Sequence, residues 1–399
     1  MRYKYKAITP NGQETDGIYI ANSETDVINM IKGNNNLVIS VERDIETEAQ
    51  IQIFKSKVRK KDLAIFCRQF YTMIDAGLGI VKCLEILIVQ TENKTLRNVI
   101  SDIFEEVQKG FTLSQAMGKH KKEFPAILIN MVEAGEVSGN LDTIMERMAV
   151  HFEKENRLEN KIKSSLIYPM ALIVVSIAVV IFMLIAVLPT FVGMFEGSDS
   201  PLPGPTKFLI GLSASMQAYW YIYLGIISII SIGIVVYKNT PEGRKFFDNL
   251  KITIPGVKVT NSKIITSRFT RTLSTLMSSG IPLLQAMEVV GKVVNNSVVQ
   301  ERLENGVENI RKGVSLSRAI KDVQIFPPMV DSMIKIGEES GALDDILYKT
   351  ADFYDEEVEM SLQKMTTLIE PILIVGMAVV IGFIVIAMAL PMFDVVNTI

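Results

Sequence analysis

Three long stretches of the chain contain apolar and small polar residues and no charge. The first lies between Lys163 and Glu196, and residues 166–188 within it are mostly Ile, Val, Leu and Ala. The other two cover residues 208–237 and 371–393. As a helix, the 23 residues from 166 to 188 would be about 35 Å long, and the hydrocarbon core of a bilayer is about 30 Å thick.

A buried helix of a soluble protein is the alternative, but such a helix rarely exceeds about 14 apolar residues without a polar face. We therefore predict transmembrane helices at residues 166–189, 219–237 and 370–393. The second begins with Tyr-Trp-Tyr-Ile-Tyr, a cluster typical of the membrane interface. Residues 190–218 would form a loop and an amphipathic segment that leads into this second span.

Basic residues flank the spans on one side. Three precede the first span, four follow the second and two precede the third: Arg157, Lys161, Lys163, Lys238, Arg244, Lys245, Lys251, Lys349 and Lys364. Segment 190–218 contains one Lys, and the tail 394–399 contains no basic residue. Because basic flanks favour the cytosolic side, we expect a multi-pass protein of the cell (inner) membrane with both large domains cytosolic. The loop and the tail would face outward.

The pattern of residues 1–45 indicates a small αβ module. Residues 2–7 alternate basic residues with Tyr or Ala, which is strand periodicity. A helix from Ser23 to Gly33 and further elements are predicted: a turn at 10–13 and strands at 15–21 and 37–43. The start of the chain has no apolar signal-peptide region, so we expect a cytosolic N-terminus. A polar linker at 46–60 follows.

One sequence motif of 21 residues occurs twice in the chain. FPAILINMVEAGEVSGNLDTI covers residues 124–144, and FPPMVDSMIKIGEESGALDDI covers residues 326–346. The match extends upstream at an offset of 203 residues and downstream at 202 residues, into both membrane spans. A unit of this length is a duplicated domain rather than a solenoid repeat. We predict a mainly α protein with two homologous cytosolic helical bundles, at residues 61–165 and 238–369.

Each copy encodes two helices joined by a tight turn. Apolar residues follow the turn at helical spacing, starting at Leu141 and Leu343. The pairs Ser138-Gly139 and Ser340-Gly341 stand where a turn and an N-cap are expected.

The Gly-Glu pair before each turn fits a simple hairpin less well. A glycine inside a helix costs about 1 kcal/mol, so its presence in both copies indicates a close approach of two helices. The glutamate would either contact a partner protein or remain solvated, and the sequence leaves both interpretations open. The candidate partner-binding residues are Gly135, Glu136, Ser138, Gly139, Gly337, Glu338, Ser340 and Gly341.

The stretch KIKSSLIYPMALIVVSIAVVIFMLIAVLP, residues 161–189, resembles the signature of the type II secretion F family. That family includes the inner-membrane platform proteins of type IV pili and their competence-pilus relatives. The resemblance covers essentially the whole chain, although Glu370 stands where an aromatic residue is expected and places a carboxylate at the membrane boundary. Structural residues at the membrane boundary, by this resemblance, are Tyr168, Pro169, Pro189, Pro371 and Pro391.

The resemblance implies a non-enzymatic platform that couples a cytosolic hexameric assembly ATPase to the extraction of pilin or pseudopilin subunits and to filament assembly. Other implied partners are inner-membrane components of the pilus or secretion machine, membrane lipid, and further copies of the chain in a dimer or higher oligomer. The sequence does not separate pilus assembly from type II secretion or DNA uptake.

Composition and motifs add no sign of catalysis. A net charge of −3 gives no basic excess for nucleic acid. Cys67 and Cys83, with only two histidines in the chain, make a poor zinc site and are expected to be reduced, buried thiols. No P-loop, HExxH or GxSxG motif occurs, so we predict no cofactor, metal or catalytic residue. The acidic cluster at 352–359 is interpreted as a solvated or partner-facing surface without a counterpart in the first copy.

A small-solute transporter or channel with cytosolic regulatory domains is the alternative function. Ion and proton pathways usually need charged groups inside the membrane, and the interiors of the three spans contain none. Small residues such as Ser176, Gly225 and Ala378 recur instead. They would permit close packing and oligomerisation, or would reflect the ordinary composition of membrane helices.

Overall fold

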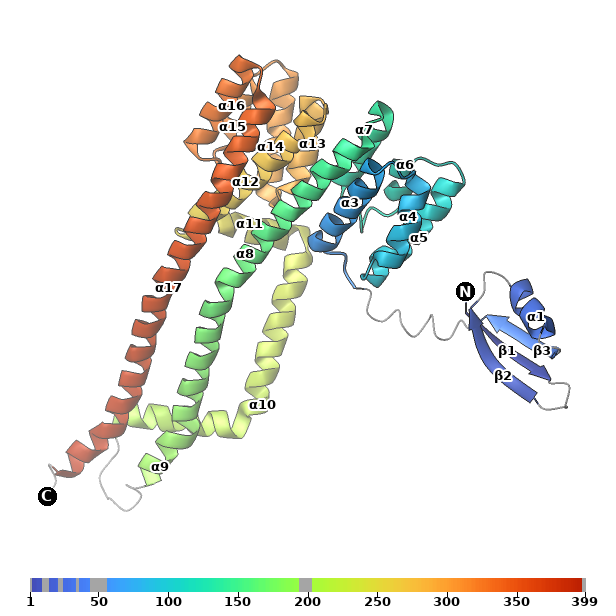
Figure 1. The fold of residues 1–399 in the computed structure, drawn as a ribbon. Coiled ribbons are helices and arrows are strands. Elements are labelled where there is room, and N and C mark those ends of the chain that lie inside the picture. Colours follow the sequence, from blue (N-terminus) through green and yellow to red (C-terminus); the bar gives the residue numbers. More distant parts are fainter. Residues whose placement is uncertain are drawn as a thin grey trace. The chain divides into compact units, whose positions relative to one another are not determined.

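The computed structural model describes residues 2–8, 14–20, 24–33, 36–43, 56–193 and 203–396 (Figure 1). It divides into two compact units, Met1–Val58 with Thr91–Val99, and Arg59–Gln90 with Ile100–Ile399. Several predicted features lie wholly or partly outside the described residues: the turn at 10–13, the cap at Ser23, the linker at 46–60, the loop at 190–218 and the tail at 394–399.

The N-terminal module is a three-stranded antiparallel sheet with one helix. Its elements are β1 (Arg2–Ile8), β2 (Glu14–Ile20), α1 (Glu24–Gly33) and β3 (Leu37–Arg43). The strand order is β2-β1-β3. Ala7 from the sheet and Val27 and Ile31 from α1 are buried together, because the apolar residues of the helix fall one turn apart and share one face. The predicted αβ module is confirmed.

The first repeat is entirely helical in its described part. Its helices are α3 (Lys60–Asp75), α4 (Ile80–Gln90), α5 (Lys94–Gln108), α6 (Leu113–Gly118), α7 (Ala126–Ser138) and α8 (Leu141–Phe182). The helix α3 packs along the first part of α8. The rings of Phe66 and Phe124 lie 5.5 Å apart in the core. Cys67 and Cys83 are free and buried, as predicted.

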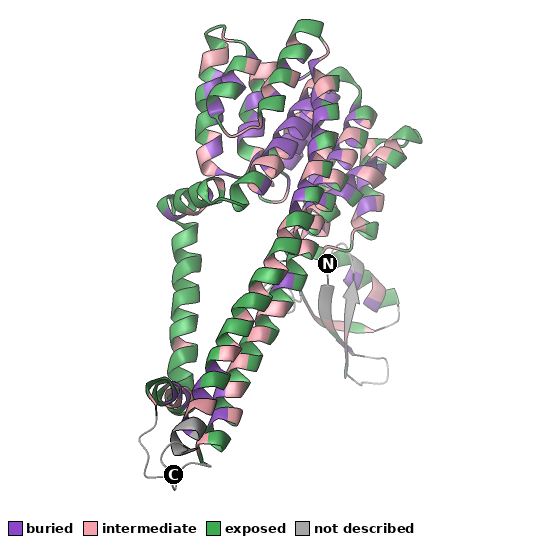
Figure 2. Ribbon diagram, turned by 90° about the vertical axis from the view of Figure 1, so that its left-hand side faces the viewer, coloured by how far each residue is buried: buried purple, intermediate pink, exposed green. Residues whose placement is uncertain are grey.

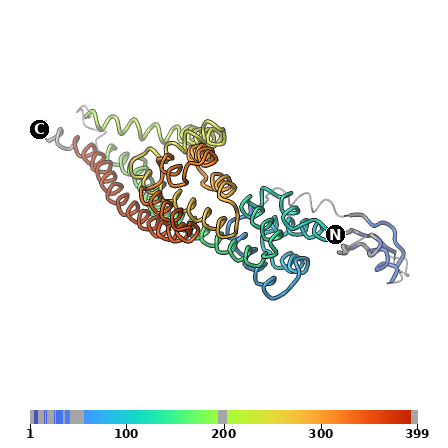
Figure 3. The backbone as a smooth tube through the Cα atoms, turned by 90° about the horizontal axis from the view of Figure 1, so that it is seen from above, coloured from blue at the N-terminus to red at the C-terminus, as the bar shows by residue number. Residues whose placement is uncertain are grey.

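The second repeat has the same arrangement, with one additional helix before it. Its helices are α11 (Pro241–Thr253), α12 (Val257–Ser278), α13 (Leu283–Val293), α14 (Ser297–Arg311), α15 (Leu316–Val323), α16 (Pro328–Ser340) and α17 (Leu343–Val396). The helix α12 packs along α17, and the view from above shows α12–α16 as one compact group (Figure 3). Phe269 and Phe326, 4.7 Å apart, repeat the pair Phe66 and Phe124.

Three helical segments are long and apolar enough to cross a membrane: Leu141–Gly193, Gly204–Asn239 and Leu343–Pro391. The first comprises α8, a π-helical turn η2 (Met183–Val187) and α9 (Leu188–Gly193); the second is α10 (Gly204–Asn239). Tyr219 has non-helical backbone angles and divides α10 into a first segment, 204–218, and a second segment, 220–239. The second segment is exposed along almost its whole length (Figure 2).

The first segment of α10 packs against the ends of the other two membrane helices. Leu209 from this segment is buried with Leu188 of α9 and Ile384 of α17. The predicted fold class is confirmed: the chain is mainly α, with two homologous bundles, three membrane-type helices and the N-terminal αβ module. The domain limits given above stay predictions.

The duplicated Gly-Glu turns as a candidate functional site

The two turns between paired helices have the same geometry. Gly139 and Gly341 end α7 and α16 in the left-handed conformation, with φ of 74° and 69°, which glycine adopts without strain. The predicted N-cap role of the serines is wrong. Ser138 is the last residue of α7, and its hydroxyl donates to the carbonyl of Ala134 at 2.8 Å. Asn140 precedes α8 instead, without a side-chain capping bond.

The glycines of both turns allow the helices to touch, as predicted. A Cβ atom on Gly135 would lie 2.9 Å from Cγ1 of Ile144, and a Cβ on Gly337 would lie 2.9 Å from Cα of Leu343. Real Cβ atoms essentially never approach other atoms this closely. Each turn therefore depends on glycine for packing of the two helices that it joins.

The glutamates have a structural role that the sequence did not reveal. The carboxylate of Glu136 accepts hydrogen bonds from the backbone N–H groups of Leu113 and Ser114, the latter at 3.0 Å, at the start of α6. Glu338 accepts from Leu316 and Ser317 at the start of α15, at 2.6 and 3.1 Å. The first N–H groups of a helix lack helical partners and attract negative charge. The interpretation of a solvated carboxylate is therefore wrong.

The outer surface of each turn remains exposed. Val137, between Glu136 and Ser138, is 86% exposed, and Ser138, Gly139, Ser340 and Gly341 are exposed as well. Gly135 and Gly337 are buried. Partner binding at these residues stays a prediction, and the accessible atoms that it concerns are those at the tip of each turn.

Ion pairs within each repeat also occur in duplicate. Lys60 pairs with Glu155, and at the corresponding positions Lys263 pairs with Glu357 at 2.6 Å. Arg68 makes two bonds of 2.9 Å to Glu153, and Arg271 pairs with Asp355 at 2.6 Å. These pairs join α3 to α8 and α12 to α17. They contradict the interpretation of residues 352–359 as a solvated or partner-facing surface without a counterpart in the first copy.

A second set of polar contacts joins α8 of the first repeat to α17 of the second. Lys154 pairs with Asp352 at 3.1 Å, and Lys161 pairs with Glu359. Asp352 also accepts from Arg271 at 2.6 Å. Burial raises the pKa of Asp352, but the bonds from Arg271 and Lys154 outweigh burial, so the net pKa is lowered. The two repeats are thus connected through charged side chains outside the membrane.

A cavity of about 320 Å³ between the repeats is lined by His151, Glu155 and Arg268, among other residues. His151 is 2% exposed, and its Nδ1 has no hydrogen-bond partner in the described part of the chain. Burial, with the charges of Lys60 and Arg271, lowers the pKa of His151 to about 3, so the imidazole is neutral. Within the described ranges, no group of His, Cys, Asp or Glu is arranged to hold a metal ion.

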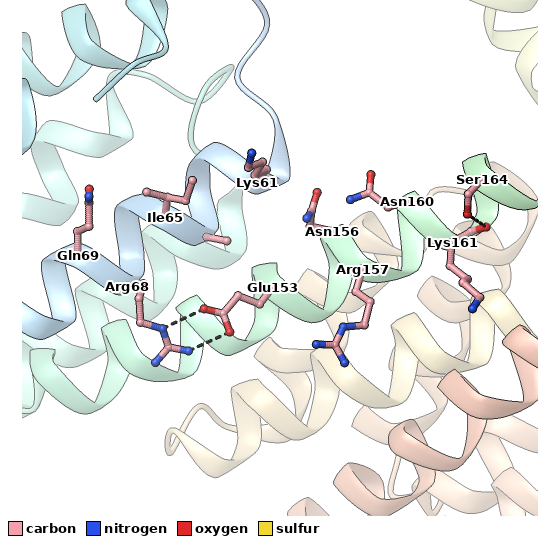
Figure 4. A pocket seen from close by; sticks show the side chains of 11 residues that line it. Lys61, Ile65, Arg68, Gln69, Glu153, Asn156, Arg157, Asn160, Lys161 and Ser164 are labelled. Atoms are coloured by element: carbon pink, nitrogen blue, oxygen red, sulfur yellow. Dashed lines mark hydrogen bonds and ion pairs between the residues drawn. The ribbon is translucent and has the colours of Figure 1, made fainter. Parts of the chain in front are cut away.

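A groove of about 720 Å³ follows α3 and α8 down to Ser164, just before the first predicted span (Figure 4). Lys61, Arg68, Arg157 and Lys161 line it, against one acidic residue, Glu153. In Figure 4, Asn156 and Asn160 project from α8 on the side of Lys61, and Arg157 projects on the other side. Of these cations, Arg68 pairs with Glu153 and Lys161 pairs with Glu359.

The residues predicted at the membrane boundary lie in continuous helices. Pro169 lies inside α8, Pro189 in α9, and Pro371 and Pro391 inside α17. The hydroxyl of Tyr168 donates to Glu370 at 3.0 Å. Tyr168 and Glu370 occupy corresponding positions in the two repeats, so this hydrogen bond joins the first repeat to the second at the residue that departs from the family pattern.

Prolines remove an N–H from a helix and free the carbonyl four residues earlier, which is costly in a membrane. The hydroxyl of Thr366 lies 3.4 Å from the carbonyl of Ser165, which Pro169 frees, and 2.9 Å from the carbonyl of Leu362 in its own helix. Two further freed carbonyls are bonded by the first segment of α10: Gln217 donates to Ile185, four before Pro189, and Thr206 donates to Ala387, four before Pro391.

The π-helical turn frees one more carbonyl. The N–H of Leu188 bonds to Met183, five residues earlier, so the carbonyl of Leu184 has no helical donor. Ser213 donates to that carbonyl at 2.6 Å. The polar residues of the first segment of α10 therefore hold two membrane helices together.

Comparison with known proteins gives matches over the whole chain. The model of the family described as type II secretion system (T2SS), protein F matches residues 66–189 and, a second time, residues 269–391. The type IV pilus assembly protein PilC of Thermus thermophilus is 36% identical, covering 99% of this chain and 98% of that protein. PilC of Myxococcus xanthus is 38% identical over 86% of this chain and 82% of its own length. The type II secretion system protein F of Vibrio cholerae is 32% identical, covering 99% and 98%.

Proposed function

Because the chain belongs to the type II secretion system protein F family, we propose that it is a non-enzymatic inner-membrane platform of a type IV pilus or type II secretion machine. The observation that carries the proposal is the match of both repeats to this family, together with relatives named for pilus assembly over almost the full length. In this role the chain binds and moves other proteins, and its own residues transform no substrate.

Continuous helices support the transmission of motion from the bundles to the membrane. The helix α8 has 42 residues and α17 has 54, so they are about 63 and about 81 Å long. Each begins at a Gly-Glu turn and continues into a membrane-type segment. The ion pairs between α8 and α17 join the two repeats where these helices leave the bundles. A force applied to one bundle would therefore reach both helices.

We place the contact with a cytosolic hexameric assembly ATPase at the tips of the two turns. Both turns lie at the end of the second unit opposite the membrane-type segments (Figure 1), and their tips are exposed. The duplication gives the chain two similar surfaces, which suit a partner built of several identical subunits, such as a hexameric ATPase. The placement requires both bundles to be cytosolic, which the basic flanks of the spans support.

We place pilin or pseudopilin subunits against the membrane-type segments. An apolar groove of about 400 Å³ lies between α8 and α17, lined by residues such as Ile177, Ile372 and Met377. Such a groove would accept the apolar helix of a subunit that leaves the bilayer. Other inner-membrane components and further copies of the chain would bind elsewhere on the same segments.

Deletion of the gene and co-purification test the proposal together. We expect loss of surface filaments or of secretion, and recovery of the assembly ATPase with the detergent-solubilised protein. Intact filaments and secretion in the deletion strain, with no ATPase recovered, would rule the platform out. Flux of a small solute through proteoliposomes that contain the purified chain would instead favour a transporter.

A further inference from the structure

The helix α11 directly follows α10 and turns sharply away from it. Thr240 caps α11 by accepting a hydrogen bond from the N–H of Gly243 at 3.1 Å. A Cβ atom on Gly243 would overlap the carbonyl oxygen of Tyr237, so no other residue fits this turn. The turn fixes α11 across the end of the second segment of α10 (Figure 1).

One face of α11 is fixed to the second bundle. Asp248 is buried, and its carboxylate accepts from the N–H and the hydroxyl of Ser297, both at 3.0 Å, at the start of α14. Asn296 donates to the carbonyl of Asp248 at 3.2 Å. The face that contains Asp248 is therefore occupied by protein.

The opposite face of α11 is apolar and largely exposed. Phe246 and Leu250 stand two residues before and two after Asp248, which places them on the other side of a helix. Phe246 is 55% exposed and Leu250 is 39% exposed. Ile254 and Val257, which follow along the chain, are exposed too. A surface helix of a soluble bundle would place polar residues here.

The membrane helix fixes the depth of this face. Tyr237 is the last aromatic residue of α10, and such residues mark the membrane interface. Its ring lies 6.5 Å from the ring of Phe246 and 6.4 Å from that of Phe247. Between Lys238 and Lys258 the chain has five basic residues against two acidic ones. Arg244, Lys245 and Lys251 pair with Asp248 or Glu301, whereas Lys238 and Lys258 make no ion pair with a described residue, and their charge favours an anionic surface.

We propose that α11 lies in the plane of the membrane, with Phe246 and Leu250 among the lipid headgroups and the adjacent basic residues on the phosphates of anionic phospholipids. This surface extends the membrane contact of α10, and the described residues of the first repeat contain no helix that corresponds to α11. Through Asp248 and Ser297, it would hold the second bundle at a fixed height and orientation above the bilayer.

Tryptophan fluorescence of the full chain in proteoliposomes tests the proposal. The chain has one tryptophan, Trp220, so Trp220→Phe provides a background for Phe246→Trp, in which one aromatic residue replaces another. Val137→Trp, at an exposed turn remote from the membrane, is the matched control. With phosphatidylglycerol in the vesicles, we expect brominated lipid to quench Phe246→Trp severalfold more than Val137→Trp, and aqueous iodide to show the reverse order.

Three results would overturn the proposal or one of its parts. Quenching of Phe246→Trp by iodide and not by brominated lipid would place α11 in water. Protection from both quenchers would show that protein covers the face. Leu250→Trp repeats the measurement should Phe246→Trp fail to fold. Replacement of phosphatidylglycerol by a neutral lipid should weaken quenching by brominated lipid, and unchanged quenching would refute the preference for anionic lipid.

Discussion

The bond from Glu136 to the start of α6 predicts a measurable weakness in the first bundle when the carboxylate is lost. Glu136→Gln keeps the size of the side chain, removes its charge and turns an N–H₂ group toward the N–H of Leu113 or Ser114. A hydrogen bond to a charged group contributes about 1.5–3 kcal/mol, and interaction with the helix dipole adds about 0.3–1 kcal/mol. With one of two bonds retained, we expect a loss of about 2 kcal/mol, or about 30-fold in the opening equilibrium.

The two cysteines report this opening directly. Both are buried in the first bundle, Cys67 in α3 and Cys83 in α4, and burial raises the pKa of both thiols, so they react slowly in the folded chain. The assay is maleimide labelling of the detergent-solubilised protein under native conditions. Glu133→Gln, at an exposed position of the same helix, is the control and should label at the parental rate. Equal labelling of Glu136→Gln and Glu133→Gln would refute the role assigned to Glu136.

Further predictions concern the turn, the buried histidine and the membrane helices. Gly337→Ala should lower the melting temperature, because its Cβ would lie 2.9 Å from the backbone at Leu343 and overpacking costs about 1–3 kcal/mol. The control Gly291→Ala, whose Cβ would lie 4.0 Å from the nearest atom, should stabilise the chain by about 0.5–1 kcal/mol. Equal effects of the two substitutions on the melting temperature would contradict the close approach of the helices at Gly337. The pKa of His151 is about 3 in the folded chain, below its ordinary 6.5, so the unfolded chain binds one more proton between these pH values. The free energy of unfolding should therefore fall as the pH falls below 6.5, by up to about 1.4 kcal/mol per pH unit. His151→Leu should show a shallower pH dependence of the melting temperature, and an unchanged slope would refute this role of His151. Thr206→Val should reduce thermal stability in detergent, because it removes the hydrogen bond to the carbonyl of Ala387. The loss should be smaller in a Pro391→Ala background, where the introduced alanine supplies a backbone N–H to that carbonyl. Equal losses in both backgrounds would refute the link between Thr206 and the carbonyl that Pro391 frees.

Periodicity was sufficient to predict the fold, because the features involved are local. Strand alternation in residues 2–7, helical spacing after Leu141 and Leu343, and the uncharged stretches each specify an element without knowledge of its neighbours. The duplication strengthened these predictions, because a glycine inside a helix that recurs at Gly135 and Gly337 indicates a close approach of helices in both copies.

The roles of the polar side chains could not be predicted because they depend on packing between distant segments. Glu136 bonds to residues 22 and 23 positions earlier in the chain, and no local pattern marks that pairing. The acidic cluster at 352–359 was compared with the first copy one residue out of register. At the correct offset of 202, Asp355 and Glu357 correspond to Glu153 and Glu155, and the duplicated ion pairs could have been found.

Photo-crosslinking at the two turns would show whether the assembly ATPase binds the chain there. A photoreactive amino acid at Val137, and another at Glu339 in the second turn, would be introduced into the full chain in cells that assemble filaments or secrete. Ile229, exposed on the second segment of α10, is the control position. We expect adducts with the assembly ATPase from both turns and none from Ile229. Functional protein that yields no ATPase adduct at either turn would contradict this expectation.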